Sequence, residues 1–135
     1  LPEESPRIFN LSLKRKRCCF MKEDKLGDKA RLSHILDAIM EIEQYTNGTD
    51  FSMFQQNSMM LNASIRQLEI IGEAANRLSD SLLAQHSDIE WPQIIALRNL
   101  LIHTYFGVNP LIIWEIIQNY LPVLKRKIRA ISENQ

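Results

Sequence analysis

The sequence has very few cysteines, and this scarcity helps to exclude several classes of protein. Cys18 and Cys19 are the only two cysteines among 135 residues, and adjacent cysteines make a poor structural disulfide. No run of about 18 apolar residues is present, so a membrane-spanning helix is not expected. The first 20 residues also lack the apolar stretch of a signal peptide. These absences favour a reducing compartment, and we expect a cytoplasmic protein that does not engage a membrane.

An excess of charge of one sign is also missing. The formal net charge is zero, so overall charge does not argue for binding to nucleic acid or to a membrane. Residues 1–20 carry five basic and two acidic side chains. Runs of charged residues are usually exposed to solvent, so this basic cluster is not by itself evidence of a nucleic-acid site. Met21 then opens the first helical pattern. We therefore expect an N-terminal basic extension at 1–20, either native or an artefact of start-site assignment, and a single helical domain at 21–135.

Several common catalytic motifs are missing as well. The four glycines are scattered, so there is no glycine-rich phosphate loop. The cysteines and the three histidines do not have the spacing of a zinc site, and no Gly-x-Ser-x-Gly nucleophile elbow occurs. We expect neither a metal nor a cofactor.

Apolar residues recur mostly every three or four positions, which is typical of helices with one buried face. No strand alternation of useful length is present. The pattern predicts an all-α, compact bundle with four main helices, at 24–46, 57–79, 91–105 and 110–131, and short helical pieces near 51–54 and 80–86.

Three sequence features predict how these helices pack. A glycine in a helix interior costs about 1 kcal/mol relative to alanine, so Gly72 suggests close approach by another helix. Pro122 should kink the last helix near Asn119. The predicted core faces of the first two helices comprise Leu32, Ile35, Leu36, Ile39 and Ile42, and then Leu61, Ile65, Leu68, Ile71 (or Gly72), Ala75 and Leu78.

The stretch "RNLLIHTY" at 98–105 places polar side chains on an otherwise apolar helix. The guanidinium of Arg98 offers a rigid fork that matches a phosphate, and the imidazole of His103 can exchange protons near neutral pH. Together they suffice to cleave RNA without a metal, through attack of the ribose 2′-hydroxyl on the adjacent phosphorus. An ideal helix separates the two residues by about 140°, so they would have to border a cleft at an interface. The apolar excess around 94–106 accordingly predicts a homodimer with this helix near the twofold axis.

The spacing alone also allows a structural interpretation. His103 could be a core histidine, Arg98 could pair with an acidic residue such as Glu73, and Tyr105 could belong to the core. The residue types do not decide between this interpretation and the catalytic one.

The same stretch resembles the Arg-x4-His-x-Tyr motif of the HepT-like toxins in the HEPN superfamily. Three longer segments are similar to that family too, and the similarity spans roughly 24–131. The segments are "IRQLEIIGEAANRLS" at 65–79, "WPQIIALRNLLIHTYFGV" at 91–108 and "IWEIIQNYLPVLKRKI" at 113–128. Residues 1–20 resemble nothing in the family.

The resemblance implies a HEPN-type bundle that dimerises through the motif helix, with a composite ribonuclease site at the interface. It implies that Arg98 and His103 form the catalytic pair, with Asn99 and Glu73 in support. It also implies the toxin of a toxin–antitoxin pair whose partner, an MntA-like nucleotidyltransferase, silences it by transferring AMP to Tyr105. The alternative is a non-catalytic helical dimer that serves as a binding partner or nucleotide-binding module for such a nucleotidyltransferase.

Overall fold

The computed structural model describes residues 25–102 and 107–134, and in this part of the chain it contains helices and no strand. None of the helices in these two ranges is long and apolar enough to cross a membrane. The all-α prediction is confirmed. The elements are α2 (Lys25–Thr46), α3 (Phe51–Gln56), α4 (Ser58–Asn76), α5 (Asp80–Gln85), α6 (Trp91–Ile102), α7 (Pro110–Glu115), the π-helical segment η2 (Ile116–Tyr120) and α8 (Leu121–Glu133).

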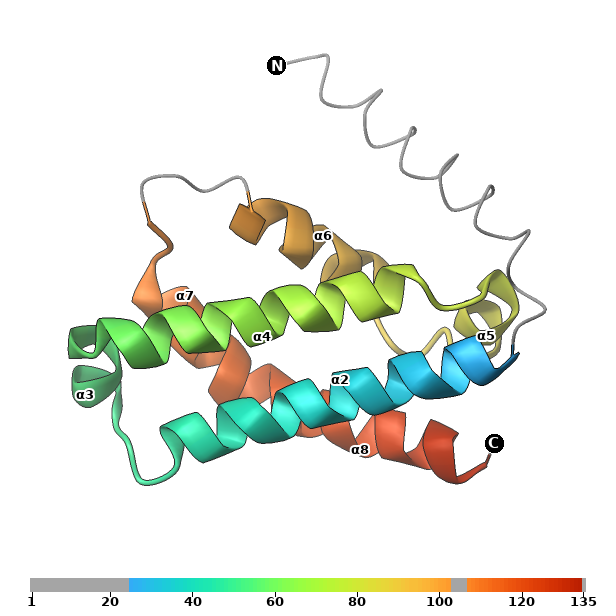
Figure 1. Cartoon of the computed structure of the whole chain (residues 1–135), viewed down its shortest axis with the longest axis horizontal. Coiled ribbons are helices and arrows are strands. Elements are labelled where there is room, and N and C mark those ends of the chain that lie inside the picture. The colour runs from blue at the N-terminus through green and yellow to red at the C-terminus, as the bar shows by residue number, and fades with distance from the viewer. Residues whose placement is uncertain (1–24, 103–106, 135) are drawn as a thin grey trace, which may run out of the picture.

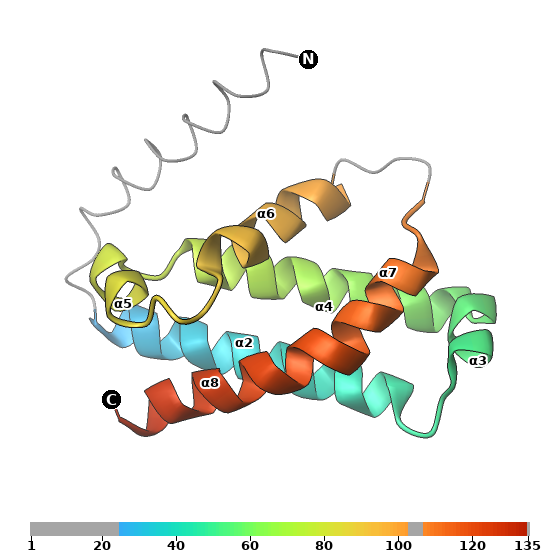
Figure 2. The ribbon, with the colours of Figure 1, turned by 180° about the vertical axis from the view of Figure 1, so that it is seen from behind.

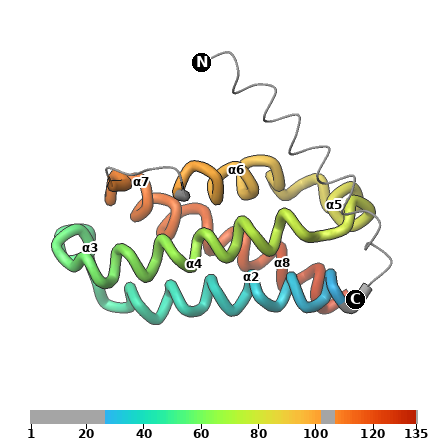
Figure 3. The backbone as a smooth tube through the Cα atoms, turned by 45° about the horizontal axis from the view of Figure 1, so that its top comes forward, coloured from blue at the N-terminus to red at the C-terminus, as the bar shows by residue number. Residues whose placement is uncertain are grey.

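Helix α4 lies in the middle of this arrangement. It runs beside α2 over most of its length, and α6 packs on its other side (Figure 1). Seen from behind, α7, η2 and α8 form one continuous bent rod, and α8 packs against α2 (Figure 2). The backbone tube shows the same order, with α4 between α2 and α6 (Figure 3). A residue on the exposed side of α4 can therefore reach groups on both neighbouring helices.

Side-chain caps set most of the helix starts. Asp50, Asn57, Ser79 and Asn109 each accept a hydrogen bond from a backbone N–H in the first turn of α3, α4, α5 and α7, respectively, which satisfies a donor that has no partner within the helix. The cap at Ser79 corrects one prediction. The second helix was expected to reach residue 79, but α4 ends at Asn76 because the chain turns there to begin α5.

The core lies along the facing sides of α2 and α4 and continues into α6, η2 and α8. The predicted core faces of the first two helices are largely confirmed, but Leu36, Leu61 and Ile65 are only partly buried. These three lie beside the core rather than within it. The predicted positions that are buried are Leu32, Ile35, Ile39, Ile42, Leu68, Ile71, Ala75 and Leu78.

The predicted disturbance at Pro122 takes the form of the π-helical segment η2, which contains Asn119. Proline has no N–H to donate, and its ring clashes with the carbonyl four residues earlier. The backbone responds by widening one turn, so the N–H of Leu121 donates to the carbonyl of Ile116, five residues back. The bend in the rod of Figure 2 begins in this region.

Gly72 is the point of closest contact between α4 and α6. A Cβ atom built on Gly72 would lie 2.6 Å from the Cβ of Arg98 and 3.1 Å from the carbonyl oxygen of Ile94. The first distance is shorter than real Cβ contacts allow. The predicted close approach by another helix is therefore confirmed, and the residue that approaches is Arg98.

The Gly72→Ala variant should be less stable than the parent protein despite the better helix propensity of alanine. Alanine contributes about 1 kcal/mol in a helix interior, but overpacking costs about 1–3 kcal/mol. The atoms in contact are a Cβ and a backbone carbonyl, so α6 itself would have to move. Urea unfolding should show a net loss of up to about 2 kcal/mol.

Asn62→Ala is the matched control, because Asn62 is exposed in the same helix and its replacement should leave stability unchanged or slightly raised. Equal or greater stability of Gly72→Ala would contradict the close contact.

Candidate functional site

The contact at Gly72 fixes where the Arg98 side chain begins. Helix α6 starts at Trp91, which is buried and donates a hydrogen bond from its indole N–H to the carbonyl of His86 at 2.9 Å. Two turns later, the Cβ of Arg98 lies directly over Gly72. The carboxylate of Glu73 follows Gly72 on α4, and its Oε1 lies 2.7 Å from Nε of Arg98. The glycine and the carboxylate together hold the arginine against α4.

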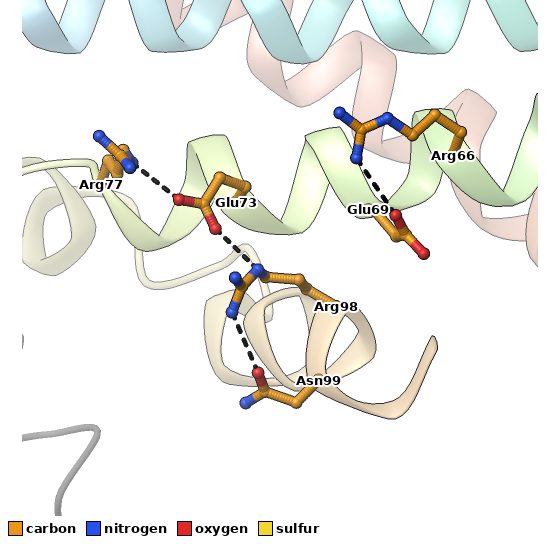
Figure 4. A network of polar contacts seen from close by, with 6 residues as sticks. All are labelled: Arg66, Glu69, Glu73, Arg77, Arg98 and Asn99. Atoms are coloured by element: carbon orange, nitrogen blue, oxygen red, sulfur yellow. Dashed lines mark hydrogen bonds and ion pairs between the residues drawn. The ribbon is translucent and has the colours of Figure 1, made fainter. Parts of the chain in front are cut away.

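The Glu73 carboxylate is shared between two arginines, as Figure 4 shows. Its Oε2 accepts a hydrogen bond from Nε of Arg77, the C-cap residue of α4, at 2.9 Å. On the other side, Nη1 of Arg98 donates to Oδ1 of Asn99 at 3.2 Å. The result is a chain of polar contacts from Arg77 through Glu73 and Arg98 to Asn99.

These contacts orient Arg98 more than they stabilise the fold. The side chains of Arg98 and Glu73 are 34% and 36% exposed, and a partly exposed pair of this kind contributes about 1 kcal/mol or less. Arginine has five N–H donors. The contacts with Glu73 and Asn99 use two of them, and no other residue in the described part of the chain takes up the outer part of the guanidinium, where an anion can bind.

Arg98 borders a surface hollow of about 480 Å³ over the exposed side of α4. Arginines in its lining outnumber carboxylates four to two, and His34 from α2 also lies there. A hollow with this balance attracts anions. Its charged lining consists of Arg31 from α2, of Arg66, Glu69 and Glu73 from α4, of Arg77 at the C-cap of α4, and of Arg98 from α6.

The structure brings together three of the five residues that the sequence singled out. Arg98, Asn99 and Glu73 form one network, so the pairing of Arg98 with Glu73 that the structural interpretation allowed does occur. His103 and Tyr105 lie outside the described residues, and their placement stays a prediction. Within 25–102 and 107–134, no group of three or more histidine, cysteine, aspartate or glutamate side chains is placed to hold a metal ion.

The other arginines of the hollow were not expected from the sequence. Arg66, Glu73 and Arg77 are seven and four residues apart, which puts them on one face of a helix, and this spacing was a usable signal. Arg31 gave no such signal because it comes from α2, and only the packing of α2 against α4 brings it into the hollow.

A second, apolar groove of about 410 Å³ separates α6 from α7 and η2. Ile94 and Leu97 line one side, and Ile112 and Ile116 line the other. Tyr120 is at its end, where burial and the negative charge of Glu90 raise the pKa of the phenol. Helices α6 and α7 also carry three exposed large apolar side chains: Leu100 at 61%, Leu111 at 45% and Ile112 at 50%.

Comparison with known proteins agrees with this architecture. Residues 35–131 match the family described as "Ribonuclease HepT-like". The chain is 33% identical over 103 residues to "Putative RNase MJ1380" of Methanocaldococcus jannaschii, covering 76% of this chain and 94% of the relative. It is 35% identical over 109 residues to "Probable ribonuclease HepT" of Thermococcus cleftensis, covering 81% and 99%. No solved structure gives a significant match.

The fold and the site define an all-helical protein with an anion-attracting, arginine-centred hollow. The chain belongs to the HepT-like ribonuclease family.

Proposed function

We propose that the protein is a metal-independent endoribonuclease of the HEPN type and the toxin of a toxin–antitoxin pair. The observation that carries this proposal is the geometry of Arg98, which Glu73 and Gly72 hold at the edge of a basic hollow, with outer donors that no described residue takes up. Membership of a ribonuclease family supports the assignment, as do relatives whose names describe them as ribonucleases.

The proposed reaction needs a proton acceptor and a clamp on the phosphate. The ribose 2′-oxygen forms a bond to the adjacent phosphorus, and the bond from phosphorus to the 5′-oxygen breaks. His103 takes the proton from the 2′-hydroxyl and returns it to the departing 5′-oxygen. Arg98 stabilises the negative charge that builds up on the non-bridging oxygens. The products are a 2′,3′-cyclic phosphate and a 5′-hydroxyl.

Glu73 and Asn99 act on this reaction through Arg98. Glu73 binds Nε and Asn99 binds Nη1, so the guanidinium plane is held from two sides. An arginine fixed in advance loses less conformational freedom when it grips a phosphate. Because Arg77 shares the Glu73 carboxylate, Glu73 does not by itself cancel the positive charge of Arg98.

The toxin would act as a homodimer that joins through the face formed by α6 and α7. On this face the side chain of Leu100 is 61% exposed and that of Ile112 is 50% exposed. Both helices border the apolar groove. Burying such side chains stabilises an interface by roughly 1.5–3 kcal/mol each. A second copy placed on this face would also bring two motif helices together, as the angular separation of Arg98 and His103 requires.

Control of the toxin would come from a nucleotidyltransferase of the MntA type that transfers AMP to Tyr105. Tyr105 follows Arg98 by seven positions in the sequence, a spacing that would put both on one face if the helix continued. An AMP group there adds a phosphodiester anion that Arg98 would attract, in competition with RNA. The nucleoside would also obstruct the hollow.

His103→Ala and Arg98→Ala should each remove RNA cleavage while leaving the helical content unchanged. Loss of an acid–base group lowers the rate by about 10²–10⁴-fold, and loss of the phosphate clamp costs a similar factor. His86→Ala is the control, because it removes another imidazole from the described chain but His86 does not line the hollow and has no part in the mechanism. Cleavage should persist in a chelator and fail on DNA. A binding module without activity is supported instead if pure wild-type protein leaves RNA intact.

Leu100→Glu combined with Ile112→Glu should convert the dimer to a monomer, because each change places a charge in a buried apolar contact. Sedimentation at micromolar concentration should show a dimer for the wild type. Met59→Glu serves as the control, since Met59 is 77% exposed on α4 and lies outside the proposed interface. A wild-type monomer would refute the dimer.

Incubation with the cognate nucleotidyltransferase and ATP should add AMP units to the wild type and none to Tyr105→Phe. Intact-mass measurement reads this directly, and the modified protein should be inactive yet fully folded. Modification of Tyr105→Phe would show that the acceptor residue is assigned wrongly.

A further inference from the structure

A row of arginines continues from Arg98 along the hollow, and the cleavage chemistry does not use it. Arg66 lies on the exposed side of α4 and Arg77 at its C-cap, and Arg31 from α2 lines the same hollow. Arg77 follows Arg66 by eleven positions, which corresponds to about 16 Å along the helix axis. This length is several times the axial rise per phosphate in one strand of a duplex, about 3.4 Å.

The acidic side chains of the hollow are already paired, so positive charge is left over. Glu69 lies 3.3 Å from Arg66, and Glu73 is shared by Arg77 and Arg98. The side chains of Arg66 and Arg77 are 70% and 57% exposed. Ion pairs of such exposed groups contribute little to stability, and a phosphate can take over the guanidinium at small cost.

Arg31 has the least satisfied guanidinium of the row. Its Nη1 makes one long hydrogen bond, 3.5 Å, to the carbonyl of Gly27, and its Nε has no partner within the described chain. A partly buried arginine of a structural ion pair would have a carboxylate beside it. Arg31 has no carboxylate within ion-pair distance among the described residues, and it lies where a ligand of the hollow would contact it.

We propose that this hollow binds the phosphates of the RNA strand on either side of the cleavage point, with Arg31, Arg66 and Arg77 as its binding residues. The inference rests on the proposed function, because it takes RNA as the substrate of the Arg98 site. Contacts to phosphates carry no base information. The hollow therefore positions the strand across Arg98 without selecting its sequence.

The test measures binding of a fluorescent single-stranded oligouridine RNA to the full chain carrying His103→Ala, which prevents cleavage. Arg31→Gln combined with Arg66→Gln removes two positive charges from the hollow. The control removes two charges from exposed positions of α8, with Arg126→Gln combined with Arg129→Gln. Thermal unfolding confirms that both proteins are folded.

The hollow variant should bind more weakly by roughly five-fold per lost phosphate contact at about 0.1 M salt, since the slope of log K against log salt falls by about 0.7 per contact. The α8 variant should match the parent in affinity and slope. An equal loss in the α8 variant, or no loss in the hollow variant, would overturn the proposal. So would a hollow variant that binds RNA normally but no longer binds the nucleotidyltransferase.

Cleavage assays separate this inference from the proposed function. The hollow substitutions are also made in the enzyme that keeps His103. If this enzyme is active and its KM and the salt dependence of KM are unchanged, the hollow inference is wrong while the proposed function stands. If wild-type protein binds RNA through the hollow but does not cleave it, the proposed function fails and the hollow inference stands.

Discussion

The contact between Gly72 and Arg98 is the constraint on which the site depends. A glycine in the middle of α4 gives up about 1 kcal/mol of helix propensity, and in return α6 comes close enough for the Cβ of Arg98 to lie over it. A larger residue would push α6 outward and move Arg98 away from Glu73. The helix that carries the motif is therefore positioned by backbone packing, and the ion pair then sets the orientation of the guanidinium.

Sharing of one carboxylate between two arginines connects this packing to the chemistry. A carboxylate paired only with Arg98 would hold the side chain but would offset its charge. With Arg77 on the second oxygen, the three groups together remain positive. Arg98 is thus fixed in direction while the group keeps a net positive charge, which favours a phosphate. Arg31, whose Nε has no partner among the described residues, adds to the same field. The energies of the individual pairs are small, so orientation is their main contribution.

The sequence predicted the helices well, because strong apolar periodicity and clear caps specify them locally. It predicted a close approach at Gly72 but not its partner, since propensity shows a cost and only packing shows what approaches. It placed the second helix end three residues late, because the Ser79 cap belongs to the next helix. The sequence allowed the pairing of Arg98 with Glu73 as one of several options, and it did not indicate that Arg31 belongs to the site. Both are contacts between helices, and the spacing of residues along one helix does not encode such contacts.

The decisive measurement is the chemical identity of the ends of RNA fragments made by the purified protein. Attack by the 2′-hydroxyl leaves a 2′,3′-cyclic phosphate on one fragment and a 5′-hydroxyl on the other. Mass spectrometry of a defined oligonucleotide should find both ends, and a single 2′-deoxy substitution at the cleaved position should prevent the cut. Fragments with 3′-hydroxyl and 5′-phosphate ends, or cleavage at the deoxy position, would contradict the role given to Arg98 and His103.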